Sequence, residues 1–214
     1  MKSLALKLDL HVHTCYSPDA LTTLEEVVLY SKKRGLDGVA ITDHDTIDGA
    51  LRLRKEKELI IIPGVEVSTL EGHVLALNIT QSIPPGLTIH ETTRLIHEAG
   101  GTAIAAHPSV FYKKMNKVDS SLDAIEVINA SAFPFLLSTY LNRKLARRLN
   151  LPQTAGSDAH YAPEIGFAYT LIDADPEVEE IVHAIKEGAI VPVGKPISWR
   201  LRLERESLSL KKWF

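Results

Sequence analysis

The chain has 214 residues, 45% of them hydrophobic, and a formal net charge of -3 at pH 7. This length suits one domain with a sizeable core, and the near-neutral charge argues against a strongly basic protein that binds long nucleic acid. The one cysteine, Cys15, excludes an intramolecular disulfide and is typical of a reducing compartment. Residues 1–7 lack the apolar stretch of a signal peptide, and no run approaches the ~18 apolar residues of a membrane span. We therefore expect a cytoplasmic protein without a membrane attachment.

Apolar runs alternate with segments of helical periodicity along the whole chain. In the first part we expect, in order, strand 4–12, helix 23–34, strand 39–42, helix 47–57, and strands 59–62, 65–68 and 73–77. In the second part we expect helix 89–99, strands 102–106 and 124–128, helix 135–149, strands 153–155 and 169–172, helix 178–187 and strand 190–193. Gly35 and Gly188 follow two of these helices as stop signals, and Pro63 with Gly64 predicts a turn after the third strand.

Strands that alternate with helices indicate βαβ units and a parallel sheet, and about seven such units follow one another here. No segment rich in Gly, Pro or Ser marks a domain boundary. We therefore expect a single α/β barrel over residues 1–198 and an amphipathic C-terminal tail over residues 199–214. An open doubly wound sheet is the alternative, although no Gly-rich phosphate loop follows any expected strand.

The nine histidines of the chain fall into two groups. His90, His97 and His183 lie on expected helices, where surface and packing roles are ordinary. The other six lie at or just beyond expected strands: His11, His13, His44, His73, His107 and His160. In a barrel of this kind the C-terminal ends of the strands meet at one face, where active sites lie. We therefore expect these six imidazoles to converge.

Two pairs of side chains have the spacing of chelating ligands. His11 and His13 are two residues apart at the end of the first strand, so both imidazoles point to the same side and suit a transition metal. Asp158 and His160 repeat this spacing near the other end of the chain. Asp9 lies on the same side as His11 and is expected to orient an imidazole. Either pair alone could equally consist of polar residues at the end of a strand.

Two further acids extend the set. Glu66 lies within an apolar strand, where a carboxylate is costly unless it is paired or binds a metal, and few basic residues lie in the strands to pair with it. Asp19 lies in the loop after the first strand, and Pro108 disfavours helical geometry at His107. Six histidines and three acids exceed the four ligands of a structural zinc site. The pattern therefore predicts two or three ions that share a bridging carboxylate.

Five motifs in sequence order resemble those of the PHP (polymerase and histidinol phosphatase) superfamily. They are Asp-Leu-His-Val-His-Thr at 9–14, Ile-Thr-Asp-His-Asp at 41–45, Gly-Val-Glu-Val-Ser at 64–68, Ala-His-Pro at 106–108 and Gly-Ser-Asp-Ala-His at 156–160. The resemblance covers residues 6–195, and the ordered set is specific where a single motif is not. It implies a single distorted (β/α)7 TIM-like barrel and a metal-dependent phosphoesterase.

The resemblance also implies which residues would bind the ions. The first ion would be held by His11, His13, Glu66 and Asp158. The second ion would share Glu66 and would also be held by His73 and His107. The third ion would be held by Asp19, His44 and His160. The cofactors would thus be two or three divalent ions of manganese, iron or zinc, all of which suit oxygen and imidazole ligands.

The expected catalytic residues are Glu66, Asp158 and His160. The carboxylates would hold the ions that lower the pKa of a water molecule and neutralise phosphate oxygens, and His160 is a candidate to assist the leaving alkoxide. No base is paired with Cys15, so we expect no nucleophilic role for it. Asn129 matches a position that is often polar in the family, and we expect it to lie just behind the ligands or else to cap the helix that follows.

We expect a phosphoesterase that acts on a small phosphorylated metabolite, a nucleotide or a short oligonucleotide. Histidinol-phosphate phosphatase and a nuclease that trims nucleic-acid ends are more specific forms of this function. The alternative is a non-catalytic barrel such as a ribonuclease P-like subunit, although the complete ligand set argues against it. Lys113, Lys114 and Lys117 follow His107 and are candidate phosphate contacts, with a solvated loop as the stronger interpretation.

Overall fold

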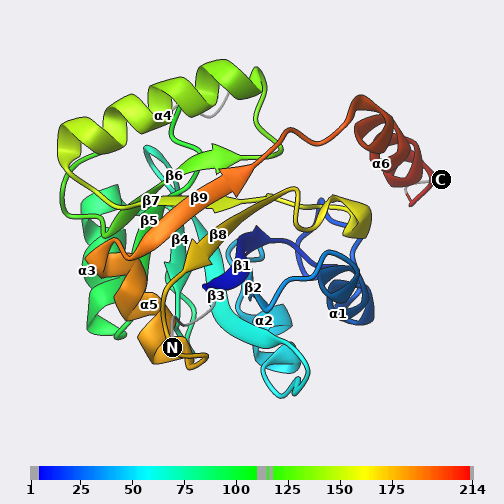
Figure 1. The fold of residues 1–214 in the computed structure, drawn as a ribbon, viewed down its shortest axis with the longest axis horizontal. Coiled ribbons are helices and arrows are strands. Elements are labelled where there is room, and N and C mark those ends of the chain that lie inside the picture. Colours follow the sequence, from blue (N-terminus) through cyan, green and yellow to red (C-terminus); the bar gives the residue numbers. More distant parts are fainter. Residues whose placement is uncertain (1–4, 110–114, 116–117, 213–214) are drawn as a thin grey trace.

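The computed structural model describes residues 5–109, 115 and 118–212, and over these residues nine strands form one sheet (Figure 1). The strands are β1 (Leu6–Val12), β2 (Gly38–Ile41), β3 (Ile60–Thr69), β4 (Gly72–Leu77), β5 (Thr102–Ala105), β6 (Ala124–Asn129), β7 (Gln153–Gly156), β8 (Ala168–Ile172) and β9 (Ile190–Gly194). The helices are α1 (Leu24–Lys33), α2 (Asp48–Leu53), α3 (Ile89–Glu98), α4 (Phe135–Leu149), the 3-10 helix η1 (Ala162–Glu164), α5 (Val178–Glu187) and α6 (Trp199–Lys212). The strand order is β7-β6-β5-β4-β3-β2-β1-β8-β9.

The first seven strands curl into a barrel, and the end of β1 meets the segment just beyond β7 at a seam. Val12, at the end of β1, forms a parallel bridge with Ala159, just beyond β7. Two hydrogen bonds fix this seam: the Asp158 amide donates to the His11 carbonyl at 2.8 Å, and the His13 amide donates to the Ala159 carbonyl at 3.0 Å. The structure therefore confirms the TIM-like barrel that the sequence predicted.

The sheet differs from the expected seven parallel strands in two ways. β8 pairs antiparallel with β1, and β9 pairs antiparallel with β8, which gives nine strands in the described part of the chain. β4 also runs against both of its neighbours, β3 and β5. The connection between β3 and β4 consists of Leu70 and Glu71, which is too short for the crossover that a parallel pair needs. The expectation of a wholly parallel sheet is therefore wrong at these strands.

β3 is one continuous strand, although Pro63 and Gly64 predicted a turn. Residues 60–63 pair in parallel with β2, and residues 64–69 pair antiparallel with β4. Pro63 has no amide hydrogen to donate, and its carbonyl accepts a hydrogen bond from the Asn78 amide at 2.7 Å. The proline and glycine therefore mark the point where the strand exchanges one partner for another.

Local side-chain signals set the ends of the helices. The Thr23 side chain accepts a hydrogen bond from the Glu26 amide at 3.2 Å, and the Glu26 carboxylate accepts one from the Thr23 amide at 2.9 Å. This reciprocal pair is a capping box at the start of α1, and Thr88 with Glu91 forms the same box at α3. α2 lacks a side-chain cap and ends at Leu53, before the expected end at residue 57.

One buried apolar cluster fills the inside of the barrel and supports its polar end. Strand side chains that include Leu8, Ile62 and Leu77 join Ile181 of α5 in this cluster. Glu66 lies four residues after Ile62 in β3, so its side chain points to the same side of the sheet. A second cluster packs α1 to α4 against the outer side of the strands. The polar end of the barrel therefore rests on an apolar layer that holds the strands in place.

Trp199–Lys212 form α6, which lies to one side of the barrel (Figure 1). The Arg202 guanidinium fastens this helix by donating to the Ser131 carbonyl at 3.0 Å and to the Ala130 carbonyl at 3.1 Å. The division of the chain into two units at residue 198 stays a prediction. Within the described ranges, no helix has the length and apolar character needed to cross a membrane.

Truncation of the inner cluster tests how far the fold depends on it. Leu77 is fully buried in this cluster, whereas Leu70, in the nearby β3–β4 turn, is 70% exposed. We expect Leu77→Ala to lower the free energy of unfolding by about 2–5 kcal/mol because it leaves a cavity. We expect Leu70→Ala to change it by less than about 0.5 kcal/mol. Urea denaturation followed by circular dichroism measures both, and equal losses in the two variants would contradict the assignment of Leu77 to the core.

Candidate metal centre

Glu66 is fully buried on β3 and lies at the centre of a cluster of histidines. The nitrogen atoms nearest to its Oε1 belong to His73 (Nδ1, 2.7 Å) and His107 (Nε2, 3.0 Å). Those nearest to its Oε2 belong to His13 (Nε2, 3.1 Å), His11 (Nε2, 3.2 Å) and His44 (Nδ1, 3.3 Å). One carboxylate therefore faces five imidazoles, which come from the ends of β1, β2, β4 and β5.

The carboxylate and imidazole charges of this cluster stabilise one another. Burial disfavours the charged form of Glu66, but the charge of His11 and the hydrogen bond from His107 hold the pKa of Glu66 well below its usual range. Burial likewise opposes the cationic form of His11, yet the charges of Glu126, Asp158 and Glu66 raise the pKa of His11 well above its usual value. The cluster therefore attracts positive charge, and protons and divalent cations compete for the same ligand atoms.

Four side chains, His11, His13, Glu66 and Asp158, offer ligand atoms that lie within 4.8 Å of one another. Asp158 Oδ1 is 3.5 Å from His11 Nε2 and 3.3 Å from His13 Nε2. The two Nε2 atoms are 3.1 Å apart. Two imidazole nitrogens and two carboxylates that converge in this way fit a divalent transition ion. These are the four residues that the sequence assigned to the first ion.

A second group consists of His44, Glu66 and His73, whose ligand atoms also lie within 4.8 Å of one another. His107 approaches the same carboxylate, with its Nε2 3.0 Å from Glu66 Oε1. The sequence assigned His73 and His107 to a second ion that shares Glu66, and the structure brings both beside it. The structure adds His44, which the sequence assigned to the third ion alone.

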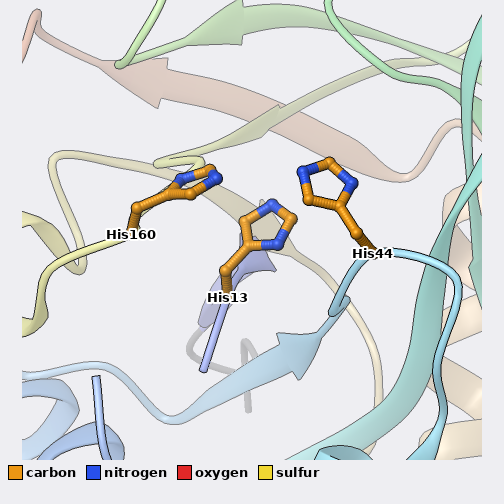
Figure 2. A group of neighbouring side chains, drawn as sticks. All are labelled: His13, His44 and His160. Atoms are coloured by element: carbon orange, nitrogen blue, oxygen red, sulfur yellow. The ribbon is translucent and has the colours of Figure 1, made fainter. Parts of the chain in front are cut away.

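A third group consists of His13, His44 and His160, whose imidazoles lie side by side (Figure 2). The ring centroid of His13 is 4.6 Å from that of His44 and 4.1 Å from that of His160. Asp19 reaches this group from an exposed position: its Oδ2 is 3.2 Å from His160 Nε2 and 3.6 Å from His44 Nε2. The three residues assigned to the third ion therefore lie together, but the group shares His13 with the first.

Uncommon backbone conformations direct two of these side chains toward the cluster. His107 has a φ of 33° and Asp158 a φ of 53°, which are left-handed values that cost about 1–3 kcal/mol in residues other than glycine. The His107 amide donates to Glu126 Oε2 at 2.9 Å, and the Asp158 amide donates to the His11 carbonyl at 2.8 Å. The backbone of His107 thus avoids the right-handed helical conformation, as Pro108 indicated.

Glu126 is a buried acid that none of the sequence motifs singled out. Its Oε1 is 3.0 Å from His11 Nδ1, so it can accept the proton of this nitrogen and leave Nε2 free to face Glu66. Its Oε2 accepts hydrogen bonds from the His107 amide at 2.9 Å and from Asn129 Nδ2 at 3.0 Å. The available signal was the same as for Glu66, an acid inside an apolar strand, here β6.

Ser17 and Asn129 add further supporting hydrogen bonds. Ser17 Oγ lies 3.1 Å from His13 Nδ1 and accepts from the His44 amide at 2.9 Å, a role that no sequence motif predicted. Asn129 Nδ2 donates to Asp158 Oδ2 at 3.2 Å, which places Asn129 just behind the proposed ligands. The alternative role of Asn129 as a helix cap is not observed, because α4 begins without a side-chain cap.

Asp9 does not contact an imidazole, contrary to expectation. Its carboxylate accepts hydrogen bonds from the main-chain amides of Ser157 and Gly166, both at 2.8 Å. The amide of His11 also lies within 3.3 Å of this carboxylate. Burial raises the pKa of Asp9 to about 6. Asp9 therefore ties the loop after β7 to β1 and supports the seam of the barrel, instead of orienting a histidine ring.

The loop after β7 is also fastened to α6. Glu164 is buried, and its Oε2 accepts hydrogen bonds from the amides of His160 at 3.1 Å and Tyr161 at 3.2 Å. Arg205 of α6 donates to the same oxygen at 3.2 Å, and the Tyr161 hydroxyl donates to Glu204 of α6 at 3.1 Å. The C-terminal helix thus supports the loop that carries His160.

Residues 9–131 match the family of the PHP domain, and residues 140–190 match the PHP-associated family. The chain belongs to the PHP family. An uncharacterized protein from Methanocaldococcus jannaschii is 36% identical over 166 residues, and the match covers 70% of this chain and 96% of that protein. A probable phosphatase of Caldicellulosiruptor bescii is 29% identical, with 75% of this chain and 82% of that protein covered.

Two further likenesses are more limited. The 5'-3' exoribonuclease Rnm of Salmonella typhimurium is 39% identical over 89 residues, which cover 37% of this PHP chain and 30% of that enzyme. A solved two-domain protein from Bacteroides vulgatus is described as containing a predicted PHP-like metal-dependent phosphoesterase. It has a TM-score of 0.73 at 18% identity, and the match covers 89% of this chain and 65% of that one. At this identity the structural likeness shows the fold. The family and its relatives support a metal-dependent phosphoesterase.

The contact between Glu126 and His11 can be tested directly in this PHP protein. Glu126→Gln keeps the shape of the side chain but removes the charge that holds a proton on His11 Nδ1. We expect the affinity for a divalent ion to fall by roughly 10–100-fold, as is typical when the partner of a ligating histidine is lost. Equilibrium titration with a competing chelator measures it. Glu98→Gln, at an exposed position on α3, is the control, and equal affinities in the two variants would contradict the role of Glu126.

Proposed function

We propose that the protein is a hydrolase that uses two to three divalent ions to cleave a phosphate ester of a small metabolite, a nucleotide or a short oligonucleotide. The observation that carries this proposal is the carboxylate of Glu66, buried among five imidazoles with Asp158 beside them. No lysine or arginine among the described residues forms an ion pair with Glu66, so the donor set is suited to cations from solution. The same chemistry admits manganese, iron or zinc.

The assignment of ligands follows the overlap of the three groups. His11, His13, Glu66 and Asp158 would hold one ion, and Glu66 would share a second with His73 and His107. His44 and His160 would hold a third with Asp19. Because His13, His44 and Glu66 each belong to two groups of neighbouring ligand atoms, we propose that the ions lie close together in one centre.

Bound divalent ions would lower the pKa of water toward neutrality and offset the negative charge of phosphate oxygens. Glu66 and Asp158 would supply the negative charge that retains these ions. His160 is an alternative candidate to assist the leaving oxygen if it does not hold an ion. Burial lowers its pKa, but the hydrogen bond to Asp19 and the charge of Asp158 more than reverse this effect and raise the pKa above its usual value. Lys113, Lys114 and Lys117 are candidate phosphate contacts, with a solvated loop as the stronger interpretation, and they lie outside the described residues.

The complete set of nine converging side chains favours this function over a non-catalytic scaffold of the ribonuclease P type, which has no need of such a set. The net charge of -3 disfavours long nucleic acid as a substrate, since binding of long nucleic acid relies on many cationic contacts to phosphates. The match to the probable phosphatase covers 75% of this chain, against 37% for the exoribonuclease, which favours a small phosphoester. A cytoplasmic location stays a prediction.

The proposal predicts metal-dependent hydrolysis with a specific requirement for His44. We expect turnover of phosphoesters in the presence of Mn²⁺ and its loss on chelation. His44→Ala should lose at least one ion and lower the rate by roughly 10²–10³-fold, the scale of losing one electrostatic contributor. His183→Ala, at an exposed position on α5, should retain both properties. Absence of turnover across a broad phosphoester panel with manganese, iron and zinc would favour the scaffold instead.

A further inference from the structure

A separate hollow lies between the loop after β6 and the start of α6. Its volume is about 440 Å³, which lies in the range of pockets that hold small ligands, roughly 300–1,000 Å³. The side chains that shape it are mostly apolar: Phe133, Phe135, Leu136, Ile197, Trp199 and Arg202. None of these residues belongs to the histidine cluster, so this hollow has no part in holding the ions.

Two aromatic rings at this pocket are unusually open to solvent. Phe133 is 52% exposed and Trp199 is 66% exposed, although large aromatic side chains are mostly buried in proteins. Their ring centroids are 5.5 Å apart with an angle of 67° between the planes, so the rings meet edge to face. In this arrangement one ring stands across the other, and a flat ligand can stack on an exposed ring face.

The walls of the pocket are held in place by main-chain hydrogen bonds. The Ile197 amide donates to the Ala130 carbonyl at 2.9 Å. The Arg202 guanidinium donates to the carbonyls of Ala130 at 3.1 Å, Ser131 at 3.0 Å and Ile197 at 3.2 Å. The guanidinium of Arg202 thus fixes the loop after β6 against α6. A pocket built in this way keeps its shape before a ligand enters.

The same two segments connect the pocket to the proposed metal centre. The loop that carries Phe133 follows Asn129, the last residue of β6, whose side chain donates to Asp158 at 3.2 Å. The helix that carries Trp199 donates from Arg205 to Glu164 in the loop that carries His160. Figure 1 shows the segment between β9 and α6 passing the loop between β6 and α4. The two segments that line the pocket therefore also make hydrogen bonds to the loop that carries Asp158 and His160.

We propose that this pocket receives the base of a nucleotide substrate whose phosphate lies at the histidine cluster. The inference rests on the proposed phosphoesterase function and narrows its substrate to nucleotides or short oligonucleotides. Among phosphoesters, nucleotides carry a large flat ring that can cover the exposed faces of Phe133 and Trp199. A sugar phosphate without a base would leave both rings in water. The pocket would thus favour nucleotides over sugar phosphates by stacking on the base, whereas the metal centre would bind the phosphate of either substrate.

Kinetics with a matched pair of substrates test this proposal. Adenosine 5'-monophosphate and ribose 5-phosphate share the phosphate and the sugar and differ in the base. For the unmodified protein we expect a higher kcat/KM with the nucleotide. Trp199→Ala and Phe133→Ala should each reduce this preference by roughly tenfold, mainly through KM, because base stacking on one aromatic ring is lost. Ribose 5-phosphate has no base to stack, so its kcat/KM should fall far less than that of the nucleotide in both variants.

Two control variants separate stacking from a general disturbance of α6. Trp199→Phe keeps an aromatic ring and should retain most of the preference for the nucleotide. Leu203→Ala removes an exposed apolar side chain of the same helix outside the pocket and should behave as the unmodified protein. Equal kcat/KM values for the two substrates in the unmodified protein, or an unchanged preference in both alanine variants, would overturn the proposal and leave the phosphoesterase function standing.

A binding experiment is independent of catalysis. Ligand-observed NMR by saturation transfer detects contact between the protein and adenosine, with ribose as the comparison. We expect transfer to the adenine protons that is lost in Trp199→Ala and retained in Leu203→Ala, even if the protein hydrolyses no phosphoester. No transfer to adenine would overturn the pocket assignment. So would sedimentation that shows a dimer dissociated by Trp199→Ala, because a second copy of the chain would then occupy the pocket.

Discussion

The buried carboxylate of Glu66 is the group on which the rest of the site depends. An ionised carboxylate away from water costs on the order of several kcal/mol unless opposite charge compensates it. Here five imidazoles from four strands surround its two oxygens. Each of these strands is thereby tied to the same pair of atoms. Glu126, Ser17 and Asn129 contact His11, His13 and Asp158, respectively, on the side away from Glu66. These contacts limit the side-chain motion of the three candidate ligands.

The seam of the barrel explains how residues from opposite ends of the chain share one centre. The hydrogen bonds between residues 11–13 and residues 158–159 bring Asp158 beside the two histidines of β1. Asp9 strengthens this seam through the amides of Ser157 and Gly166, and α6 supports the next turn through Arg205. Closure of the barrel therefore also brings the first and last groups of candidate ligands together. A metal centre at such a seam would also link cation binding to the stability of the barrel.

Much of this arrangement could be predicted from the sequence, because strand periodicity fixes which face a side chain takes. That rule placed His11 with His13 and marked Glu66 as an acid that needs a partner. It does not fix distances between strands, and the family resemblance assigned His44 to one ion although this side chain also approaches Glu66. The direction of β4 and the partner exchange at Pro63 depend on long-range pairing, which periodicity does not reveal. Glu126 could have been found, since it satisfies the same criterion as Glu66.

The most direct test of the account is the metal content of Glu66→Gln. The substitution keeps the shape of the side chain and removes one unit of negative charge from the centre of the cluster. After reconstitution with manganese, iron or zinc and removal of loose ions, elemental analysis should find at least two ions per chain in the unmodified protein and fewer in the folded variant. A variant that keeps the full number of ions, at unchanged affinity, would contradict the claim that one buried carboxylate organises the centre.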